Sequence, residues 1–318
     1  MREAIDRRAI PLNASESRWL TGGGYPVRRI DWTVAKGAKG SILFLPGRGD
    51  FYEKYLETLD HWNRQGWNVT ASDWRGQAGS GRLGFDAVTG HIDDFATWVE
   101  DLGTLWKHWM AETPGPHILA GHSMGGHIVL RALAEQQVDP DGLLLSAPML
   151  GFVASVLPDV LMHQAAKLMK ALGDPRRPAW KWSEKPGQPP EDRIHLLTHD
   201  AERYHDEMFW RKARPELTMG PGSWGWVERA YASMRLLASP GLLEAIDTPI
   251  LILATDDDKL VGFQAIARAA GRLRDCEMVH FGKEARHEIL READHVRDRA
   301  LHACDTFLNR IAAAQAKP

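Results

Sequence analysis

Short runs of apolar residues, separated by segments with helical spacing, constrain the fold of this chain more than any other feature of its sequence. The run at 41–45, for example, is SILFL and ends at Pro46-Gly47, so it has no polar face to turn toward water. A strand of this kind is buried on both faces of a sheet, which is the usual condition of parallel strands. On this basis we predict strands at 41–45, 67–72, 117–120, 142–146, 249–254 and 277–281.

Helical patterns fill the intervals between these strands. Between 92 and 110, apolar side chains recur at intervals of three and four residues over about five turns. We predict further helices at 51–65, 124–136, 263–273 and 287–313. Strands that alternate with helices in this way indicate an α/β fold, in which helices flank both faces of a mostly parallel central sheet.

The alternation stops between about 150 and 243, where helical patterns continue without a buried strand. Beyond this region the strand and helix patterns resume. We therefore predict a single α/β domain, made of residues 1–149 and 244–318, that is interrupted by a helical insertion at 150–243.

Two features stand out inside the insertion. An apolar stripe with helical spacing comes first, and Pro158 is suited to the start of its helix. The stripe consists of Val156, Leu157, Val160, Leu161, Leu168 and Met169. Residues 174–190 are rich in Pro, Lys, Arg and Trp, which indicates a loop.

Composition excludes several classes of protein. With 318 residues and 44% hydrophobic side chains the chain has ordinary globular usage, and a net charge of -3 is too small to indicate nucleic acid as a partner. It has no run of about 18 apolar residues and its charged first residues lack a signal-peptide pattern, so we expect a cytoplasmic protein. The two cysteines, Cys276 and Cys304, form no CxxC pair, and we expect both to be buried.

A G-x-S-x-G pattern centred on Ser123 joins the strand at 117–120 to the helix at 124–136. At such a turn the chain reverses within a few residues, which leaves the serine in a strained backbone conformation with its hydroxyl exposed. Gly121 and Gly125 lie where neighbouring backbone leaves no room for a side chain. Because the helix N-terminus also favours developing negative charge, we predict that Ser123 is a nucleophile.

A serine hydroxyl needs a neighbouring base to act as a nucleophile near pH 7. On folds with this turn, the serine is followed along the chain by an acid and then by a histidine, each after a strand. His287 follows the last predicted strand and is the predicted base, whereas we expect His280, inside that strand, to be packed as a structural residue. The acid should follow the preceding strand, where spacing does not choose among Asp256, Asp257 and Asp258.

Acyl transfer also needs two N–H donors that point at the developing oxyanion. The first predicted donor is the amide of Met124, directly after the serine. The second should come from the loop after the first predicted strand, where we choose the amide of Arg48. We expect the side chain of Arg48 to be solvated.

Five motifs follow one another along nearly the whole chain. They are Leu45-Pro46-Gly47-Arg48-Gly49, Asp73-Trp74-Arg75-Gly76-Gln77, Gly121-His122-Ser123-Met124-Gly125-Gly126, Asp256-Asp257-Asp258-Lys259-Leu260-Val261 and His287-Glu288. Together they resemble the lysophospholipase and monoacylglycerol lipase branch of the α/β-hydrolases, also called serine aminopeptidase-like hydrolases. Glu53-Lys54-Tyr55 resembles the bacterial lysophospholipases most, and Pro46 departs from the His-Gly of monoacylglycerol lipases.

The resemblance implies that Asp258 is the catalytic aspartate and that 150–243 forms a lid that carries the substrate specificity. We therefore predict hydrolysis of a carboxylic ester of a monoacyl lipid, such as a lysophospholipid or a monoacylglycerol, without a cofactor or metal. A histidine base predicts a rate that rises with pH near its usual pKa of about 6.5. Transient contact with a membrane surface, at the inner membrane, fits such a substrate.

Aromatic and sulfur-containing side chains of the insertion are the candidate lining of an acyl channel. We predict that Trp224, Trp226 and Met208 bind substrate. Further candidates are Met162, Met169, Trp180, Trp182 and Trp210.

Three other interpretations of the sequence compete with this one. The formal GxGxxG at 79–84 begins six residues after Asp73 and opens no helical pattern, so we expect no dinucleotide site. An aminopeptidase of the same fold would use insertion carboxylates to hold a substrate ammonium, although Glu202, Asp206 and Glu207 also fit a solvated helix face with paired charges. The third rival is a non-catalytic binding protein on a hydrolase fold.

Overall fold

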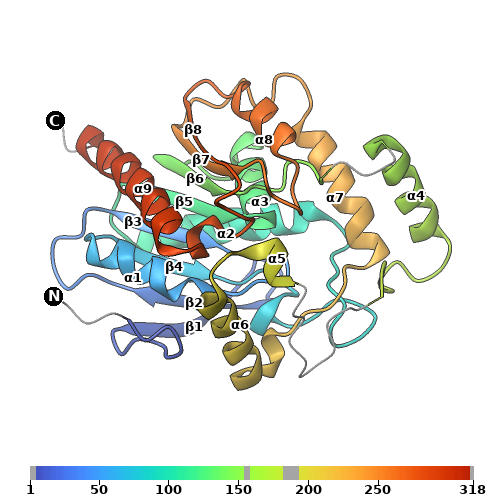
Figure 1. Ribbon diagram of the computed structural model, residues 1–318, viewed down its shortest axis with the longest axis horizontal. Coiled ribbons are helices and arrows are strands. Elements are labelled where there is room, and N and C mark those ends of the chain that lie inside the picture. The colour runs from blue at the N-terminus through green and yellow to red at the C-terminus, as the bar shows by residue number, and fades with distance from the viewer. Residues whose placement is uncertain (1–4, 154–157, 182–192, 316–318) are drawn as a thin grey trace.

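The structure is a computed structural model that describes residues 5–153, 158–181 and 193–315. An eight-stranded sheet forms its centre, in the order β1-β2-β4-β3-β5-β6-β7-β8 (Figure 1). The strands are β1 (Ala14–Leu20), β2 (Pro26–Trp32), β3 (Ser41–Leu45), β4 (Asn68–Ser72), β5 (His117–His122), β6 (Gly142–Ser146), β7 (Ile250–Thr255) and β8 (Cys276–Phe281). β2 runs antiparallel to both β1 and β4, and every other neighbouring pair is parallel. The predicted mostly parallel sheet is confirmed.

All six predicted strands are present, with bounds that differ from the predicted ones by no more than two residues. Every residue of β3, β6 and β7 is buried, which explains why each of these strands has only one polar residue: Ser41, Ser146 and Thr255. β1 and β2 were not predicted. β1 lies at the edge of the sheet and exposes most of its residues, so its sequence carries no apolar run to reveal it.

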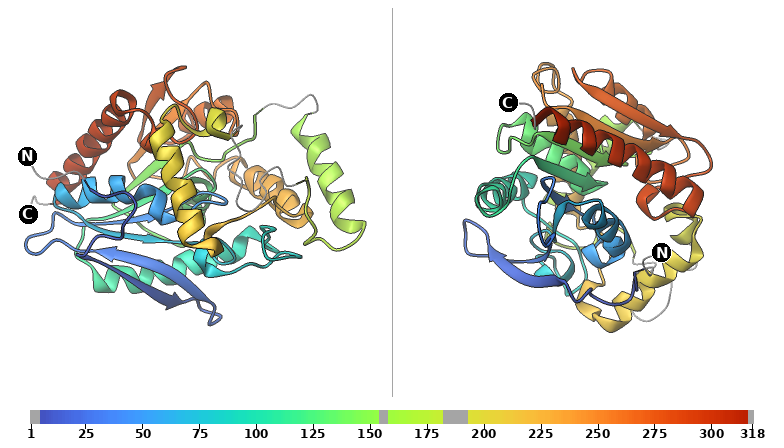
Figure 2. Two further views of the ribbon diagram at one scale, coloured as in Figure 1. Left: turned by 60° about the horizontal axis from the view of Figure 1, so that its bottom comes forward. Right: turned by 90° about the vertical axis from the view of Figure 1, so that its left-hand side faces the viewer.

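Helices cover both faces of the sheet, with α1 and α9 on one side and α2 and α3 on the other (Figure 2). The elements outside the insertion are η1 (Tyr52–Tyr55), α1 (Leu56–Arg64), η2 (Ala78–Ser80), α2 (Phe95–Glu112), α3 (Met124–Ala134), α8 (Phe263–Ala270), η5 (Ile289–Arg291) and α9 (Asp294–Gln315). The aromatic side chains that marked the predicted helix at 92–110 pack inward, and Trp98, Trp106 and Trp109 are fully buried. The predicted α/β fold therefore has the expected layers.

The chain between β6 and β7 forms helices in place of strands. They are α4 (Asp159–Ala171), α5 (Ile194–Leu197), α6 (Ala201–Ala213), η4 (Pro215–Leu217) and α7 (Trp224–Leu237). No strand is assigned between 150 and 243 in the part of the chain that the structure describes, as predicted. α4 packs against α7 and lies at the outer end of the molecule (Figure 1).

The apolar stripe predicted for α4 is present, but it faces outward. Val160, Leu161 and Leu168 expose 56%, 53% and 59% of their surface, whereas His163 and Ala166 are buried. Two residues of the predicted stripe lie outside the described residues, Val156 and Leu157. The later part of the predicted loop, 182–190, lies outside them too. No described helix, α4 included, has the length and apolar character to cross a membrane.

The two cysteines differ in burial. Cys304 is buried within α9, as predicted, but Cys276 is only half-buried, and both thiols are free. The reason lies in the topology: Cys276 begins β8, which has β7 as its single neighbour and so leaves one flank of the sheet open. The prediction that Cys276 is buried is wrong.

Candidate active site

Ser123 occupies the turn between β5 and α3, and its backbone conformation is unusual. Its φ is 52° and its ψ is −118°, in a region that residues other than glycine rarely adopt. Such strain persists only where the surrounding structure holds it, and it concentrates at functional sites. The Ser123 amide donates to the carbonyl of Ser146 at 2.9 Å, and its own carbonyl accepts from Met149 and His127. The strained turn predicted from the motif is therefore present.

The glycines around Ser123 are required by close approach of backbone. A Cβ on Gly125 would lie 2.4 Å from the carbonyl oxygens of both Leu45 and Pro46. A Cβ on Gly121 would lie 2.8 Å from backbone atoms of Gly125 and its neighbour. Because real Cβ atoms do not approach backbone this closely, no other residue fits either position.

His287, Asp258 and Ser123 come together at the ends of three different strands. Nε2 of His287 lies 2.9 Å from Oγ of Ser123, and Nδ1 lies 2.7 Å from Oδ2 of Asp258. With the Nδ1 proton directed at the carboxylate, Nε2 is left to accept the serine proton. The arrangement has the geometry of a nucleophile, a base and an orienting acid.

The structure distinguishes the three adjacent aspartates. Asp258 is buried, and its Oδ1 accepts the amides of Leu260 and Val261 at 2.8 and 3.0 Å. Asp257 pairs with the neighbouring lysine at 2.6 Å, and Asp256 lies 3.4 Å from His280. Only Asp258 of the three contacts His287, in agreement with the residue that the resemblance implied.

Opposing effects set the charges of this group. Burial disfavours the imidazolium, but the charge and hydrogen bond of Asp258, with smaller contributions from Glu288 and Asp50, raise the pKa of His287 above its ordinary value. Burial likewise opposes the charged form of Asp258, yet His287 and the two amides lower the pKa of that carboxyl. The pair therefore stabilises an imidazolium, the form that a base takes after it accepts a proton.

Two other histidines, His122 and His280, lie in surroundings that differ from those of His287. The ring of His122 lies 4.8 Å from that of His287, and burial together with His287 lowers the pKa of His122 to about 4, so it is neutral near pH 7. His280, which we expected to be packed, is exposed at the sheet edge and stacks on Phe263. Its position on the edge strand explains the error.

The loop after β3 lies directly against the serine turn. A Cβ on Gly47 would lie 3.0 Å from Cβ of Ser123. The indole of Trp74 donates to the carbonyl of Pro46 at 2.8 Å, and Oε1 of Gln77 accepts the amide of Gly49 at 2.9 Å. The Asp73–Gln77 motif therefore holds this loop, a role that sequence reasoning missed although it singled out the motif.

The two predicted oxyanion donors come from different segments of the chain. Met124 is the first residue of α3, and the first amides of a helix have no acceptor within it. Arg48 and Ser123 line the same cavity. Met124 therefore follows the serine directly, and Arg48 belongs to the loop whose Gly47 approaches Ser123.

The side chain of Arg48 is not solvated as expected. Its guanidinium lies over the rings of Trp226 and Trp180, at 5.0 and 5.2 Å from their centres. Nη2 also donates to the carbonyl of Gly220 at 2.7 Å. Because the insertion folds back over the loop after β3, it supplies aromatic partners that the sequence near Arg48 does not reveal.

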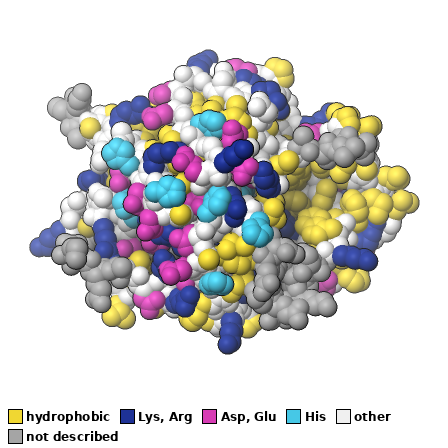
Figure 3. Space-filling view, viewed as in Figure 1, with side chains coloured by type: hydrophobic (Ala, Val, Ile, Leu, Met, Phe, Trp, Pro, Cys, Tyr) yellow, Lys and Arg dark blue, Asp and Glu magenta, His cyan; other side chains and the backbone are white. Residues whose placement is uncertain are grey.

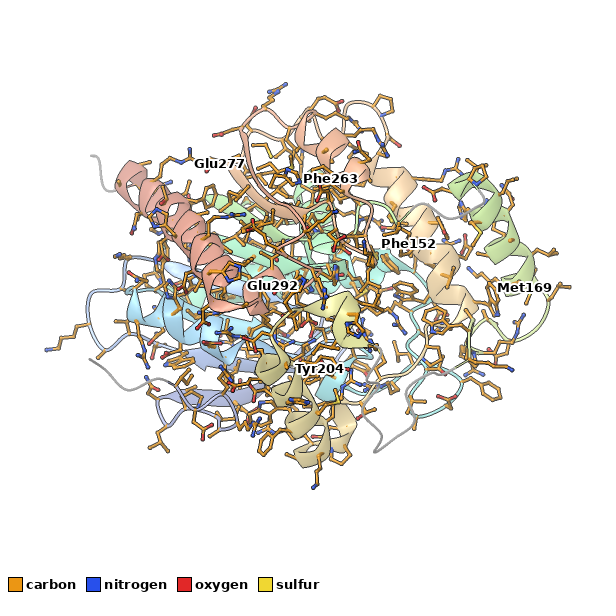
Figure 4. All side chains as sticks on the ribbon, viewed as in Figure 1. Phe152, Met169, Tyr204, Phe263, Glu277 and Glu292 are labelled. Atoms are coloured by element: carbon orange, nitrogen blue, oxygen red, sulfur yellow. The ribbon has the colours of Figure 1, made fainter. Side chains whose placement is uncertain are left out.

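A cavity of about 570 Å³ opens above Ser123 and His287. Of the predicted lining residues, Met162, Trp180, Trp224 and Trp226 border it. Met208, Met169 and Trp210 do not, and Figure 4 shows Met169 on the outer part of α4. Another candidate lies outside the described residues, Trp182. Apolar lining residues that were not predicted include Phe152, Leu196, Met219 and Tyr231.

The carboxylates of α6 are not a solvated face. Asp206 and Glu207 are buried, and only Glu202 is exposed. Asp206 pairs with two arginines from the N-terminal segment, at 2.6 and 2.7 Å, and Glu207 pairs with Lys54 at 3.0 Å. None of the three carboxylates borders the cavity. The prediction of a solvated face is therefore wrong for two of the three residues, since α6 packs onto the core.

The glycines at 79–84 have structural reasons to be glycines. A Cβ on Gly79 would lie 2.8 Å from the side chain of Arg28, and one on Gly84 would lie 2.1 Å from the carbonyl of Thr89. The segment forms a short 3-10 turn and then a loop, and no helix begins at it.

Among the described residues no group of three or more His, Cys, Asp or Glu side chains is arranged to hold a metal ion.

A mostly parallel sheet that carries a serine on a strained turn after one strand, with an aspartate and a histidine after later strands, defines an α/β-hydrolase. The chain belongs to the serine aminopeptidase S33 family, whose profile matches residues 36–294. Lysophospholipase L2 of Escherichia coli K12 is 32% identical over 286 residues, which cover 85% of this chain and 80% of the relative. The predicted family is therefore confirmed.

Further comparisons agree with this assignment. A monoacylglycerol lipase of Mycolicibacterium smegmatis is 27% identical over 254 residues, which cover 79% of this chain and 82% of the relative. A solved monoglyceride lipase of Saccharomyces cerevisiae superposes with a TM-score of 0.72 at 18% identity, over 91% of this chain and 92% of that one. These relatives support the predicted class, a serine ester hydrolase, and the solved structure shares the fold.

Proposed function

We propose that this chain hydrolyses carboxylic esters through an acyl-enzyme formed on Ser123. The observation that supports this most is the hydrogen-bonded series from Asp258 through His287 to Ser123, which ends at the cavity. In this proposal Ser123 is the nucleophile, His287 the general base and Asp258 the residue that orients the imidazole. The amides of Met124 and Arg48 form the oxyanion hole.

The reaction needs nothing beyond these groups and water. Oγ of Ser123 attacks the ester carbonyl carbon while Nε2 of His287 takes the hydroxyl proton, and the two amides stabilise the charge on the carbonyl oxygen. The bond to the alcohol oxygen then breaks, and His287 returns the proton to the departing alcohol. A water molecule deprotonated by His287 attacks the acyl-enzyme, which releases the carboxylic acid and restores Ser123.

The cavity favours a substrate with one acyl chain and a polar alcohol. Side chains from α4, α7 and their surroundings make one part of its wall apolar; these are Phe152, Met162, Trp224, Val227 and Tyr231. Lys54, Asp50 and Glu288 make another part polar, and Lys54 pairs with Glu207 of α6. We assign the acyl chain to the apolar wall and the alcohol, as in a lysophospholipid or a monoacylglycerol, to the polar wall.

Residues 150–243 act as a lid in this proposal, and 1–149 with 244–318 form the hydrolase core. The lining supports the division, because core residues such as Ser123 and His287 form the floor of the cavity while the insertion contributes much of its wall. Met208 is no longer assigned to the substrate, since it does not border the cavity. Trp224 and Trp226 stay as proposed substrate contacts.

Contact with a lipid surface is part of the proposal. Figure 3 shows hydrophobic side chains gathered over α4 and α7 beside a hollow in the surface. Val160, Leu161, Leu168 and Leu172 are among the exposed large apolar residues there. An exposed apolar patch of this kind next to a substrate cavity favours docking onto lipid aggregates that contain the substrate. Cytoplasmic location stays a prediction from the sequence, which cell fractionation tests.

The hypothesis that the chain is an aminopeptidase has less support. Such an enzyme needs unpaired carboxylates beside the serine to hold a substrate ammonium. The candidates on α6, Asp206 and Glu207, are neutralised by arginine and lysine side chains and lie outside the cavity lining. Amide turnover is therefore expected to be minor.

The proposal is tested by labelling and by a substrate panel. A fluorophosphonate probe should label the wild-type protein and fail to label Ser123→Ala, whose circular dichroism should match the wild type. Esters of varied chain length and head group, measured beside aminoacyl-arylamides, then define the substrate. Equal labelling of Ser123→Ala would reject the proposed nucleophile, and faster turnover of arylamides than of esters would favour the aminopeptidase.

A further inference from the structure

A buried ion cluster lies beneath the loop that carries Arg48. Three of its members, Lys54, Asp50 and Glu288, also border the polar wall of the cavity, but none takes part in the proposed chemical steps. The centre of the cluster is Lys54 of η1, in the Glu53-Lys54-Tyr55 motif. Nζ of Lys54 lies 2.9 Å from Asp50, 3.0 Å from Glu207 and 2.5 Å from Glu288. All four side chains expose 5% of their surface or less. Solvent therefore screens the attractions between these charges very little.

The first carboxylate belongs to the proposed oxyanion loop. Oδ2 of Asp50 accepts the amide of Gly47 at 3.3 Å and the hydroxyl of Tyr55 at 2.6 Å, while Oδ1 faces Lys54. Asp50 therefore spans the loop and holds the backbone on the N-terminal side of Arg48. The direction of the Arg48 amide depends on this short stretch of chain.

The second carboxylate belongs to the turn that carries the proposed base. Glu288 follows His287 directly, and its amide donates to the carbonyl of Leu197 at 2.8 Å. Oε1 of Glu288 faces Lys54, and Oε2 bonds to Arg291. The position of the His287 backbone is thus linked to Lys54 through one side chain.

The third carboxylate has no such neighbour. Glu207 lies on α6, which contributes no residue to the cavity lining, and its other oxygen pairs with Arg211 at 2.6 Å. It shares the ammonium with Asp50 and Glu288 and is as deeply buried as they are. Glu207 is therefore a natural control for any effect of Asp50 or Glu288 on the reaction.

Lysine suits this position for a physical reason. An ammonium is a compact charge, and here it lies within 3.0 Å of three carboxylates from separate segments: it donates a hydrogen bond to Glu288 and forms ion pairs with Asp50 and Glu207. Without the ammonium, three like charges would remain close together in a buried space, and the segments that carry them would move apart. The planar guanidinium of an arginine does not match three acceptors arranged around one point.

We propose that Lys54 is a positioning residue that holds the oxyanion loop, through Asp50, in register with the turn of His287, through Glu288. This proposal rests on the proposed function, because it takes the Arg48 amide and His287 to act on the same ester. In this proposal Lys54 keeps the Arg48 amide and the imidazole of His287 at the separation that the reaction needs.

The test compares Lys54→Met with Glu207→Gln as a matched control. Each removes one charged member of the same buried cluster, so both are expected to lower thermal stability. The substrate is a p-nitrophenyl ester, which lacks the polar alcohol assigned to the wall that Lys54 borders. Measured below the melting transition on this ester, Lys54→Met should lower kcat about 100-fold with KM changed less than about threefold, as small misplacements of catalytic groups do. Glu207→Gln should keep kcat within about threefold of the wild type.

Hydrogen–deuterium exchange supplies a readout that does not depend on activity. Peptides that cover 46–50 and 283–291 should exchange faster in Lys54→Met and unchanged in Glu207→Gln. Lys54→Arg should recover stability more fully than kcat, because it restores the charge without the three-way geometry. If Lys54→Met does not fold, Asp50→Asn takes its place: it keeps the size of the side chain and removes the charge on the loop side.

The outcomes separate this proposal from the proposed function. A folded Lys54→Met with near wild-type kcat and unchanged exchange would overturn the positioning role, and so would an equal loss of kcat in Glu207→Gln. If the wild type were neither labelled at Ser123 nor active on esters, the proposed function would fail. Exchange in the two peptides would still decide whether Lys54 holds both segments.

Discussion

Nδ1 of His287 lies 2.7 Å from Oδ2 of Asp258, and their side chains expose only 5% and 1% of their surface. The other oxygen of Asp258 accepts the amides of Leu260 and Val261, which keeps the carboxylate from turning away. In this arrangement the neutral imidazole carries its proton on Nδ1 and presents Nε2 to the serine. Two predictions follow from the pair.

The first concerns pH. Burial opposes the charge on His287, but Asp258 outweighs it and raises the pKa above the ordinary value, so the acid limb should lie above the 6.5 that the sequence suggested. A base must be neutral to accept a proton, so activity is full above this pKa and is lost as the pH falls through it. The pH dependence of kcat/KM on an ester measures this limb, and a midpoint well below 6.5 would contradict the assignment.

The second concerns Asp258→Asn. The substitution removes the carboxylate that accepts the Nδ1 proton and holds the imidazole in the tautomer the reaction needs, so kcat should fall about 10³- to 10⁴-fold. It also removes the main attraction that raises the pKa of His287, so the acid limb should shift to lower pH. Asp256→Asn is the matched control, because Asp256 is exposed and contacts His280 rather than His287. Comparable losses in both variants would mean that the acid is misassigned.

A third prediction tests the packing of the serine turn. Gly125→Ala places a Cβ 2.4 Å from two carbonyl oxygens, so it should lower the free energy of unfolding by about 3 kcal/mol or prevent folding. Gly282→Ala has no atom within 4 Å of the added Cβ and should change that free energy by less than about 1 kcal/mol. Urea unfolding measures both, and equal effects would show that close approach is not the reason for Gly125.

A fourth prediction concerns stability in acid. Burial opposes the charges of Glu288 and Glu207, but Lys54 and neighbouring arginines lower the pKa of each to about 2. Their contribution is present above the unfolded pKa of about 4.3 and is lost as the pH falls from there toward 2, at most about 3 kcal/mol for each group. Glu207→Gln should therefore be less stable than the wild type at pH 6 but lose less stability between pH 5 and pH 3. Parallel stability curves for the two proteins would refute this.

The fifth prediction addresses the surface of α4. Leu161→Glu combined with Leu168→Glu should weaken binding to phospholipid vesicles about 10- to 100-fold, because each exposed leucine loses apolar burial in lipid. Hydrolysis of a short, monomeric ester should not change. Gln164→Glu adds a charge to the same helix without removing an apolar side chain, so it serves as the control. If Gln164→Glu weakens vesicle binding as much, repulsion of charge rather than loss of apolar contact is the cause.

Several elements were predictable because their causes are local. β3, β6 and β7 are buried on both faces, so their residues are apolar wherever the rest of the chain lies. The turn at Ser123 was predictable for a similar reason: Gly121 and Gly125 are required by backbone within the same turn and by one neighbouring loop. In each case the constraint falls on a few adjacent residues and leaves a pattern in them, even though at Gly125 the backbone that imposes it, Leu45 and Pro46, is distant in sequence.

Other features left no local pattern. β1 forms an exposed antiparallel edge, where residues need not be apolar, and β2 lies inside the sheet but contains two arginines and an aspartate, so it has no apolar run either. The stripe on α4 has the spacing of a buried helix face but lies outward, and spacing does not tell which side a neighbouring helix covers. The guanidinium of Arg48 lies over the rings of Trp180 and Trp226, which come from a part of the chain far from it.

The α/β layers, the strained turn at the serine and the order of its partners along the chain were therefore predictable from the sequence, because they leave patterns in neighbouring residues. Spacing left Asp256, Asp257 and Asp258 open, and only the family resemblance favoured Asp258. Its contact with His287, the cavity wall and the cluster around Lys54 appear only in three dimensions. They depend on distances between side chains such as Ser123 and His287, which are 164 positions apart and 2.9 Å from contact atom to contact atom. Burial selects an apolar residue at each buried position, so it leaves a pattern in the sequence. A hydrogen bond or ion pair between distant residues exists only once the whole chain has folded, so it leaves none.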